Sequence, residues 1–329
     1  MPKPEARTRV GLIGCGAWGW NYLHVLRESH RFELVGACDN DVSLCRRVER
    51  EYGIKTMAST ELMQKCEAVV IAAPTAQHVP MAVSAMAIGC HVLIEKPAAR
   101  TTAEVDSLDA ASFQYGKRYM AGHLMLYHEA IQQAIGQAKS GGWGDPLLFR
   151  STRWGTGRKR DGETPLESLA SHDLAMIHAL FSADEPLSGM CHPDGHGWIS
   201  GPRVSVDVSW AHARKVRTVD IHCEDAILTV DDMVTHGGFQ VYDRKGNGTS
   251  FPPVGHEEPL GKQCRAFADM IQGGVEPPSG PKSVRAVARW LEGFRKGERH
   301  AGDDARGVAG SVEVRDGTKA AKAGKRPRA

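Results

Sequence analysis

Several features that mark specialised classes of protein are scarce in this chain of 329 residues. Basic and acidic residues nearly balance, and the formal net charge of +2 gives no bias toward nucleic acid or a charged membrane surface. Aromatic residues make up only 6% and do not alternate with a basic stripe. No apolar run approaches the roughly 20 residues that span a bilayer, and the first residues lack the apolar core of a signal peptide. We therefore expect a soluble, cytoplasmic protein with no nucleic-acid or membrane partner.

The cysteines lack a pattern as well. Eight are present, and none forms a C-x-x-C pair. Several fall in apparent strands or helices, where a thiol behaves as a small hydrophobic group, so we expect free thiols and no disulfide framework. Cys191, His192 and His196 suggest a metal site, but their spacing fits no known ligand set, and we expect no metal.

What the chain does contain is a glycine-rich turn near its N-terminus. Gly14, Gly16 and Gly19 have the spacing G-x-G-x-x-G, between an apolar run and a helical pattern. In a dinucleotide-binding turn, the first glycine permits the turn, the second lets the backbone approach a pyrophosphate, and the third lets the helix pack on the strand. The helix N-terminus adds N–H groups and a partial positive charge. The spacing alone also fits an ordinary strand-to-helix turn.

An acidic residue follows at the position that such a turn requires. Asp39 ends a second apolar run, twenty residues after Gly19. A carboxylate there binds both hydroxyls of an adenosine ribose. Because it would repel a 2′-phosphate, we expect NAD, although Arg46 and Arg47 lie near enough in sequence to keep NADP open.

Strand-like and helix-like runs alternate as far as residue 121, which predicts a doubly wound parallel sheet in an α/β protein. Ligands bind at the carboxyl ends of the strands in such sheets. The predicted strands are 10–13, 32–38, 54–57, 68–72, 91–94 and 118–121. Helices are predicted over 41–51, 59–65, 77–88 and 102–115.

The pattern changes from residue 123 to β-forming runs separated by turns. We expect a dinucleotide-binding domain of residues 1–122 and an α+β domain of residues 123–300 with an open-faced, largely antiparallel sheet. Residues 301–329 form a basic tail with too few apolar residues to order itself. Strands are predicted at 147–154, 197–200, 203–210, 216–223, 226–230 and 238–242, and helices at 128–140, 166–181, 261–272 and 283–295.

The sequence Glu95-Lys96-Pro97 follows the strand at 91–94. A lysine at the carboxyl end of a central strand points into the crevice where a nicotinamide would lie. Its ammonium group can hydrogen-bond a substrate hydroxyl and favour loss of that proton. Pro97 would fix the turn, and its peptide bond is a candidate for the cis form. An exposed lysine at a strand end is the alternative interpretation.

His172 and Asp173 stand at the start of an apolar helical pattern. Histidine exchanges a proton near neutral pH without a large pKa shift. Placed near Lys96, His172 would act as a base or relay, and Asp173 would orient a neighbouring group. The pair also fits a helix start that carries no chemistry.

With these motifs the chain resembles the Gfo/Idh/MocA family of NAD(P)-dependent sugar oxidoreductases over nearly all of its length except the tail. The resemblance implies a Rossmann domain, an open-faced sheet used for dimer or tetramer contacts, and Lys96 as a catalytic residue. The family pattern places an Asp four residues before the catalytic His, where this chain has Ser168. That departure is similar to the sugar 3-dehydrogenase branch that includes UDP-N-acetylglucosamine 3-dehydrogenases. The motifs are Gly14–Gly19, Ala37–Asp39, Ala68–Thr75 with His78, His91–Pro97, and Gly122 with His123.

The predicted site has three sets of residues. Lys96 and His172 are the catalytic pair, with roles that are open to exchange. The arginines of the substrate set suit a nucleotide diphosphate, or else form a solvated basic loop. The cofactor set is Gly14, Cys15, Gly16, Ala17, Trp18, Gly19, Asp39, Asn40, Ala73, Pro74, Thr75, His78, Glu95, Lys96 and His123. The substrate set is Lys96, Tyr127, Arg153, Trp154, Arg158, Arg160, His172 and Asp173.

We predict NAD-dependent oxidation of a secondary hydroxyl, foremost at C3, of a sugar, nucleotide sugar or aminoglycoside. The keto sugar would then suit a PLP aminotransferase in amino-sugar or antibiotic biosynthesis. Oxidation of inositol or a free sugar, or reduction of a keto sugar, are alternatives on the same fold. A non-catalytic NAD-binding sensor is an alternative of another class.

Overall fold

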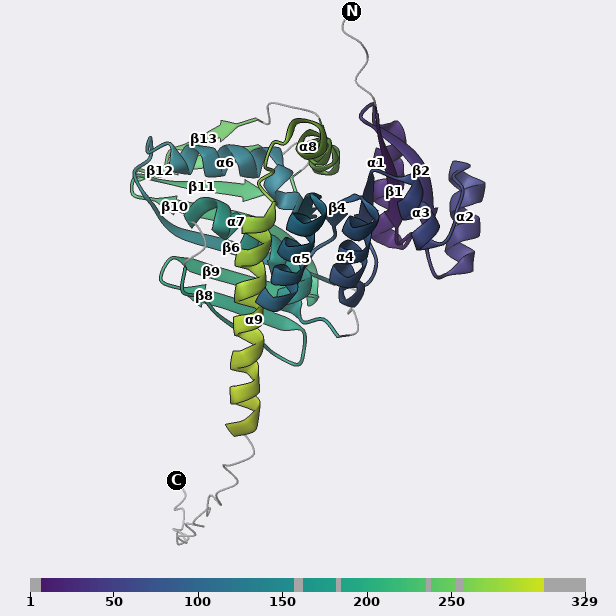
Figure 1. Cartoon of the computed structure of the whole chain (residues 1–329). Helices are drawn as coiled ribbons and strands as arrows, with labels where there is room; N and C mark the ends of the chain where they lie inside the picture. Colours follow the sequence, from purple (N-terminus) through teal and green to yellow (C-terminus); the bar gives the residue numbers. More distant parts are fainter. Residues whose placement is uncertain (1–6, 157–161, 182–184, 235–237, 253–256, 305–329) are drawn as a thin grey trace, which may run out of the picture.

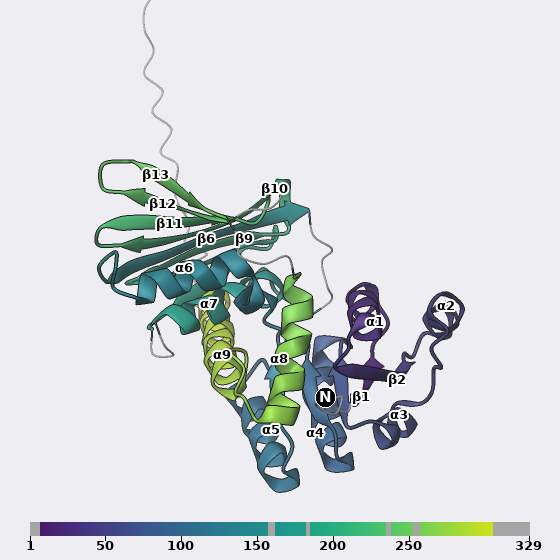
Figure 2. The same ribbon diagram turned by 90° about the horizontal axis from the view of Figure 1, so that it is seen from above.

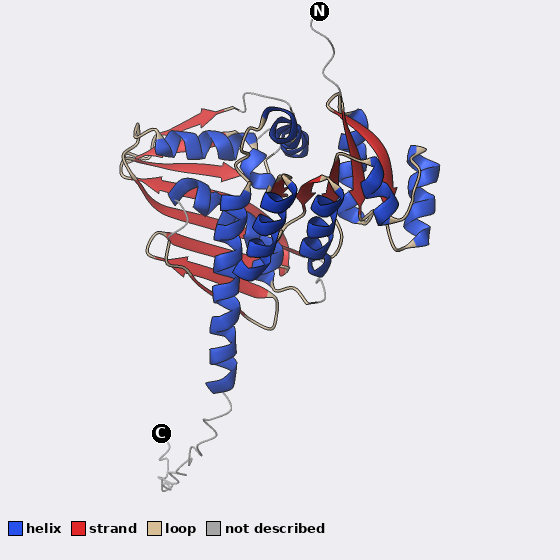
Figure 3. Cartoon of the chain, in the orientation of Figure 1, coloured by secondary structure: helices blue, strands red, loops and turns tan. Residues whose placement is uncertain are grey.

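The computed structural model describes residues 7–156, 162–181, 185–234, 238–252 and 257–304. Two β-sheets organise these residues, a smaller one from the N-terminal part of the chain and a larger one from the part that follows (Figures 1 and 3). Most of the predicted tail, from residue 305 onward, lies outside the described residues. None of the described helices has the length and apolar composition needed to cross a membrane.

The N-terminal sheet has five parallel strands in the order β2-β1-β3-β4-β5, as the alternating pattern predicts. Its central strands are apolar and buried along their length because helices cover both faces. The strands are β1 (Thr8–Ile13), β2 (Phe32–Cys38), β3 (Ala68–Ile71), β4 (His91–Ile94) and β5 (Tyr119–Ala121). The helices are α1 (Ala17–Glu28), α2 (Val42–Tyr52), α3 (Ser59–Lys65), α4 (His78–Ile88) and α5 (Thr102–Tyr115).

One predicted strand of this sheet is wrong. The run at 54–57 contributes only an isolated bridge between Thr56 and Ala37, so the sheet has five strands where six were predicted. Local signals set the neighbouring helix α2 correctly. The Asp41 side chain accepts the Ser43 N–H at 2.8 Å, and Gly53 ends the helix with a φ of 65°, a conformation that glycine adopts without strain.

The larger sheet has eight strands in the order β13-β12-β11-β10-β6-β9-β8-β7. Only the pair β6–β9 is parallel among the pairings of its described strands, which confirms the largely antiparallel prediction. Two strands, β7 and β13, were not predicted. The strands are β6 (Pro146–Thr156), β7 (Ser188–Cys191), β8 (His196–Gly201), β9 (Val204–Ser209), β10 (Ala211–Cys223), β11 (Ala226–Asp231), β12 (Phe239–Asp243) and β13 (Gly248–Phe251).

The described helices lie on one face of this sheet, and its other face is open (Figure 2). Helices α6 (Glu129–Lys139) and α7 (Ser171–Phe181) lie next to the covered face, and a short π-helical turn, Leu166–Ala170, leads into α7. Along β6, Phe149, Ser151 and Arg153 are buried while the residues between them are more exposed. This period of two assigns Phe149, Ser151 and Arg153 to the covered face and the even-numbered residues from 150 to 154 to the open face.

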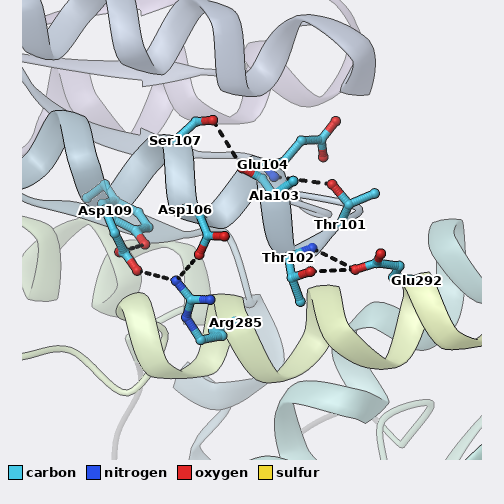
Figure 4. Close-up of polar contacts among 10 residues, drawn as sticks. Thr101, Thr102, Ala103, Glu104, Asp106, Ser107, Asp109, Arg285 and Glu292 are labelled. Carbon is cyan, nitrogen blue, oxygen red and sulfur yellow. Dashed lines mark hydrogen bonds and ion pairs between the residues drawn. The ribbon is translucent and has the colours of Figure 1, made fainter.

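Two C-terminal helices, α8 (Pro259–Gly273) and α9 (Pro281–Asp304), connect the two sheets. Helix α9 packs on both α5 and α7. Figure 4 shows its polar contacts with α5, where Arg285 bonds Asp106 and Asp109 at 2.8 and 2.7 Å. Glu292 accepts the backbone N–H of Thr102 at 2.9 Å, at the first turn of α5. The larger sheet's helices are thereby tied to the parallel sheet.

Candidate active site

The glycine-rich turn has the geometry that a dinucleotide requires. Gly14 has a φ of 97°, and a Cβ there would lie 2.5 Å from the backbone of Ala72. A Cβ on Gly19 would lie 1.9 Å from the Gly14 carbonyl oxygen, so helix α1 packs directly on the turn. Gly16 differs, because a Cβ on this residue would have no heavy atom within 4 Å. The open space at Gly16 and the uncapped N-terminus of α1 fit a pyrophosphate.

Asp39 is held beside this turn by two backbone amides. The Cys15 N–H donates to its Oδ2 at 2.6 Å and the Asp41 N–H to its Oδ1 at 2.8 Å. Each oxygen keeps a further lone pair with which to accept a ribose hydroxyl. Arg47 is engaged elsewhere, since its guanidinium lies 4.2 Å over the Trp20 ring and bonds Glu51 at 3.0 Å.

Glu95 lies beneath the turn, in a buried polar network. Its Oε1 accepts the Trp18 indole N–H at 2.5 Å and the Tyr22 hydroxyl at 2.7 Å, and Gln263 donates to the same hydroxyl at 2.8 Å. Burial and the nearby carboxylate raise the pKa of Tyr22. The prediction that Glu95 and Trp18 bind the cofactor stays a prediction; in the structure their side chains bond each other and join β4 to α1.

The next residue, Lys96, reaches from the parallel sheet to the other part of the molecule. Its Nζ donates to the Ser168 carbonyl oxygen at 2.5 Å. Ser168 lies in the π-helical turn, four residues before His172. The Lys96–Pro97 peptide bond is cis. The contact brings the two predicted catalytic residues into one site, although their order in the chain gives no sign of it.

His172, the second residue of α7, has a buried Nδ1 with no hydrogen-bond partner among the described residues. Burial lowers the pKa of its imidazole well below the usual value, and the positive charges of Lys96 and Arg153 lower it further. The ring is therefore neutral at neutral pH. A neutral imidazole with a free ring nitrogen can accept a proton from a substrate hydroxyl.

Arg153 and Asp173 are buried next to His172 and bond each other. Arg153 Nε lies 3.2 Å from Asp173 Oδ2, and the Ser151 hydroxyl donates to Oδ1 at 2.6 Å. Asp173 is fully buried. The prediction that both residues bind substrate stays a prediction; in the structure the ion pair joins the two side chains and fixes the start of α7 on β6.

A second arginine lies directly opposite Arg153. Arg217 of β10 is its register partner, and like charges in that position destabilise a sheet unless each is paired. Arg217 bonds Asp232 at 3.4 Å, and Asp232 also contacts His128 at 3.3 Å. These cations give the surroundings of His172 a positive character that sequence reasoning did not identify.

Other predicted substrate residues lie elsewhere. Trp154 is on the open face of the sheet, where its indole N–H donates to Asp207 at 2.8 Å, because the strand period turns it away from Arg153. Tyr127 is buried, and its hydroxyl lies 2.8 Å from Ser279 Oγ. Both substrate assignments stay predictions. Arg158 and Arg160 lie outside the described residues.

His123 and His78, predicted to contact the cofactor, are both buried. His123 Nδ1 lies 3.1 Å from Ser283 Oγ, and burial lowers the pKa of this ring to about 3. The two ring nitrogens of His78 face backbone carbonyls. Both cofactor assignments stay predictions, and in the structure these rings bond the protein itself.

Thr75 makes a contact that no sequence pattern predicts. It opens a 3₁₀ turn, Thr75–Gln77, after β3, and its hydroxyl donates to Glu163 Oε1 at 2.6 Å. Ala73 and Pro74 lead into this turn, and Pro74 is exposed. Glu163 belongs to the segment before the π-helical turn, so the contact is a second link across the site.

A protein-family model matches the N-terminal part of the chain. Residues 8–123 match a model described as "Oxidoreductase family, NAD-binding Rossmann fold" (GFO_IDH_MocA). A curated relative, UDP-N-acetylglucosamine 3-dehydrogenase from Acidithiobacillus ferrooxidans, is 29% identical over 178 residues. The match covers 54% of this chain and 55% of that protein, so it spans about half of the relative's length.

Solved structures extend the similarity to the fold of nearly the whole chain. UDP-N-acetylglucosamine 3-dehydrogenase GnnA from Acidithiobacillus ferrooxidans has a TM-score of 0.79 at 21% identity, over 90% of this chain and 99% of that one. KijD10, a 3-ketoreductase from Actinomadura kijaniata solved with TDP-benzene and NADP, has a TM-score of 0.79 at 18% identity, over 89% and 98%. Taken with the geometry of the glycine-rich turn, the family match shows that residues 8–123 form an NAD-binding Rossmann fold similar to that of the Gfo/Idh/MocA oxidoreductases.

Proposed function

We propose that the protein oxidises a secondary hydroxyl of a sugar, using NAD as the hydride acceptor. The observation that carries the proposal is the bond from Lys96 Nζ to the Ser168 carbonyl. It places an ammonium group from the end of β4 at the start of the helix that presents a neutral His172. A sensor that only bound NAD would not need this pair.

The residues supply proton chemistry and positioning. NAD, when bound, takes the hydride from the carbon that carries the hydroxyl. The Lys96 ammonium group holds the substrate oxygen and favours its ionisation, and the His172 imidazole takes the proton. Lys96 and Arg153 disfavour the resulting imidazolium, so His172 gives up the proton again and the base is restored.

NAD is the proposed cofactor in preference to NADP. The amides of Cys15 and Asp41 fix the Asp39 carboxylate beside the glycine-rich turn, where its charge would repel a 2′-phosphate. Arg47, one of the two arginines that keep NADP open, is stacked on Trp20. The fixed Asp39 carboxylate therefore favours a ribose without a 2′-phosphate.

The proposed substrate is a nucleotide sugar oxidised at C3. The relative named UDP-N-acetylglucosamine 3-dehydrogenase supports this class, and the partly exposed Arg217 beside the site suits an anionic diphosphate. We propose that residues 123–300 bind this substrate and that the open sheet face joins copies of the chain. The 3-keto product suits a PLP aminotransferase, which would place the enzyme in amino-sugar biosynthesis.

The test is NADH formation with a panel of UDP-N-acetylglucosamine, UDP-glucose, an aminoglycoside intermediate, free glucose and myo-inositol, each also assayed with NADP. We expect turnover with a UDP-sugar and NAD. Oxidation of only free glucose or inositol would replace the proposed substrate class. Tight NADH binding without oxidation of any candidate would favour the sensor. A Lys96→Met variant controls for contaminating dehydrogenases.

A further inference from the structure

His78 occupies an unusual position between two turns of the site. It is the first residue of α4 and is 2% exposed. Its Nδ1 lies 2.9 Å from the Pro97 carbonyl oxygen, and its Nε2 lies 2.8 Å from the Ala73 carbonyl oxygen. One buried ring thus spans two main-chain acceptors.

Those acceptors belong to the turns that carry the site residues. Pro97 directly follows Lys96 at the end of β4, and Ala73 lies two residues before Thr75 at the end of β3. The main-chain ladder between the two strands extends to the Glu95 N–H, which donates to the Ile71 carbonyl at 2.8 Å. His78 continues the connection past that point, with a side chain in place of backbone groups.

The chemistry of the ring decides how strong this connection is. A carbonyl oxygen only accepts, and a neutral imidazole has one N–H to donate. Burial lowers the pKa of His78, whereas the two carbonyls and the carboxylates of Glu95 and Glu163 act in the opposite direction. The ring therefore bonds one turn when neutral, and both turns when it takes up a proton.

We propose that His78 is a positioning residue for Lys96, holding the turn that carries this lysine against the turn that carries Thr75. The proposal rests on the proposed function in one respect, that Lys96 is the group that meets the substrate oxygen. Without His78 the cis Lys96–Pro97 turn keeps its ladder bond at Glu95 but loses its side-chain link to the β3 turn. The Lys96 ammonium group would then lose its fixed place beside Ser168.

The test measures Lys96 directly, so it does not depend on the identity of the substrate. Competitive labelling with acetic anhydride and mass spectrometry gives the reactivity of the Lys96 amine, and fluorescence titration gives NADH affinity. His91→Asn is the matched control. His91 is the first residue of β4, the strand that leads to Lys96, and it accepts the Arg118 N–H at 3.1 Å. Loss of one hydrogen bond predicts that His78→Ala changes Lys96 labelling by about fivefold, with weaker NADH binding.

Added imidazole should partly restore wild-type labelling to His78→Ala by filling the vacated space, while His91→Asn should label like the wild type throughout. If His78→Ala does not fold, His78→Gln gives the same comparison, since its single amide nitrogen cannot reach both carbonyls. Wild-type labelling and NADH affinity in the His78 variant would overturn the proposal. So would an equal change in His91→Asn, which would show general loosening of the sheet. Failure to oxidise any sugar would leave the labelling result intact and would count against the proposed function alone.

Discussion

The two halves of the site are built by different means. The nucleotide turn consists of backbone geometry, namely a positive φ at Gly14, open space at Gly16 and a close helix contact at Gly19. The opposite half consists of side chains from separate elements, with Lys96 from the end of β4, Arg153 from β6, and His172 and Asp173 from α7. The first half depends on the absence of side chains. The second depends on side chains whose charges must be matched.

This difference predicts different responses to substitution. Adding atoms should impair the nucleotide turn, while removing a charged group should impair the opposite half of the site. Substitutions in each half should therefore differ in whether they change turnover, stability or cofactor affinity.

Replacing Lys96 should reduce turnover most. Lys96→Met removes the group that holds the substrate oxygen, and loss of one acid–base participant lowers kcat by about 10²–10⁴-fold. NADH affinity should stay near that of the wild type, because the glycine-rich turn is unchanged. Steady-state kinetics and NADH titration check both parts. Equal loss of turnover and NADH affinity would contradict the division between the halves.

Breaking the buried ion pair should destabilise the protein without touching the nucleotide turn. Asp173→Asn leaves the Arg153 guanidinium buried without its counter-charge, at a cost of about 3–5 kcal/mol in the free energy of unfolding. Asp207→Asn, on the open sheet face, is the control and should cost less than about 1 kcal/mol. Urea unfolding measures both. A double variant, Arg153→Met with Asp173→Leu, should recover most of the loss.

Two alanine substitutions in the glycine-rich turn should separate stability from binding. Gly19→Ala places a methyl group against the Gly14 carbonyl and should cost about 1–3 kcal/mol of stability. Gly16→Ala meets no protein atom, so stability should stay unchanged while NADH affinity falls. Thermal unfolding and fluorescence titration compare them. Equal loss of stability in both variants would show that Gly16 has no special place toward the cofactor.

The smallest effect is expected at the contact between α9 and α5, which lies outside both halves. Its bonds to Thr102 and Lys296 lower the pKa of Glu292 to about 2. Because the folded-state pKa lies below the unfolded one, the contribution of Glu292 to stability is present above about pH 4.5 and is lost as pH falls toward 2. Glu292→Gln should cost about 0.5 kcal/mol at pH 7 and nothing at pH 2. Glu33→Gln, at an exposed position of β2, is the control in urea unfolding at several pH values.

The same contrast explains what could be predicted from the sequence. The nucleotide turn and Asp39 could be predicted because a backbone device needs fixed spacings within a short stretch. The parallel sheet and most strands of the larger sheet followed from periodicity. Strands β7 and β13 were missed because each is a four-residue strand at a sheet edge, where alternation is too short to recognise.

The opposite half of the site, which contains Lys96, Arg153, His172 and Asp173, was predicted only in part. Lys96 and His172 stood out by residue type and by resemblance, but the Arg153–Asp173 pair and the Thr75–Glu163 bond join residues 20 and 88 positions apart. No spacing rule reaches across such separations. Trp154 lies on the other face of β6 from Arg153 because the odd and even residues of a strand face opposite ways, and the sequence around β6 did not show which set is covered.

The bond from Lys96 to position 168 has one more consequence. The acceptor is a main-chain oxygen, which every amino acid supplies, so the contact does not depend on the side chain at position 168. Side-chain scanning at Ser168 would report only on local helix geometry. Exchanging the amide between Ser168 and Leu169 for an ester, which weakens the carbonyl as an acceptor, would test the bond itself. Residue identity at this position is therefore a poor guide to whether a related chain retains a working site.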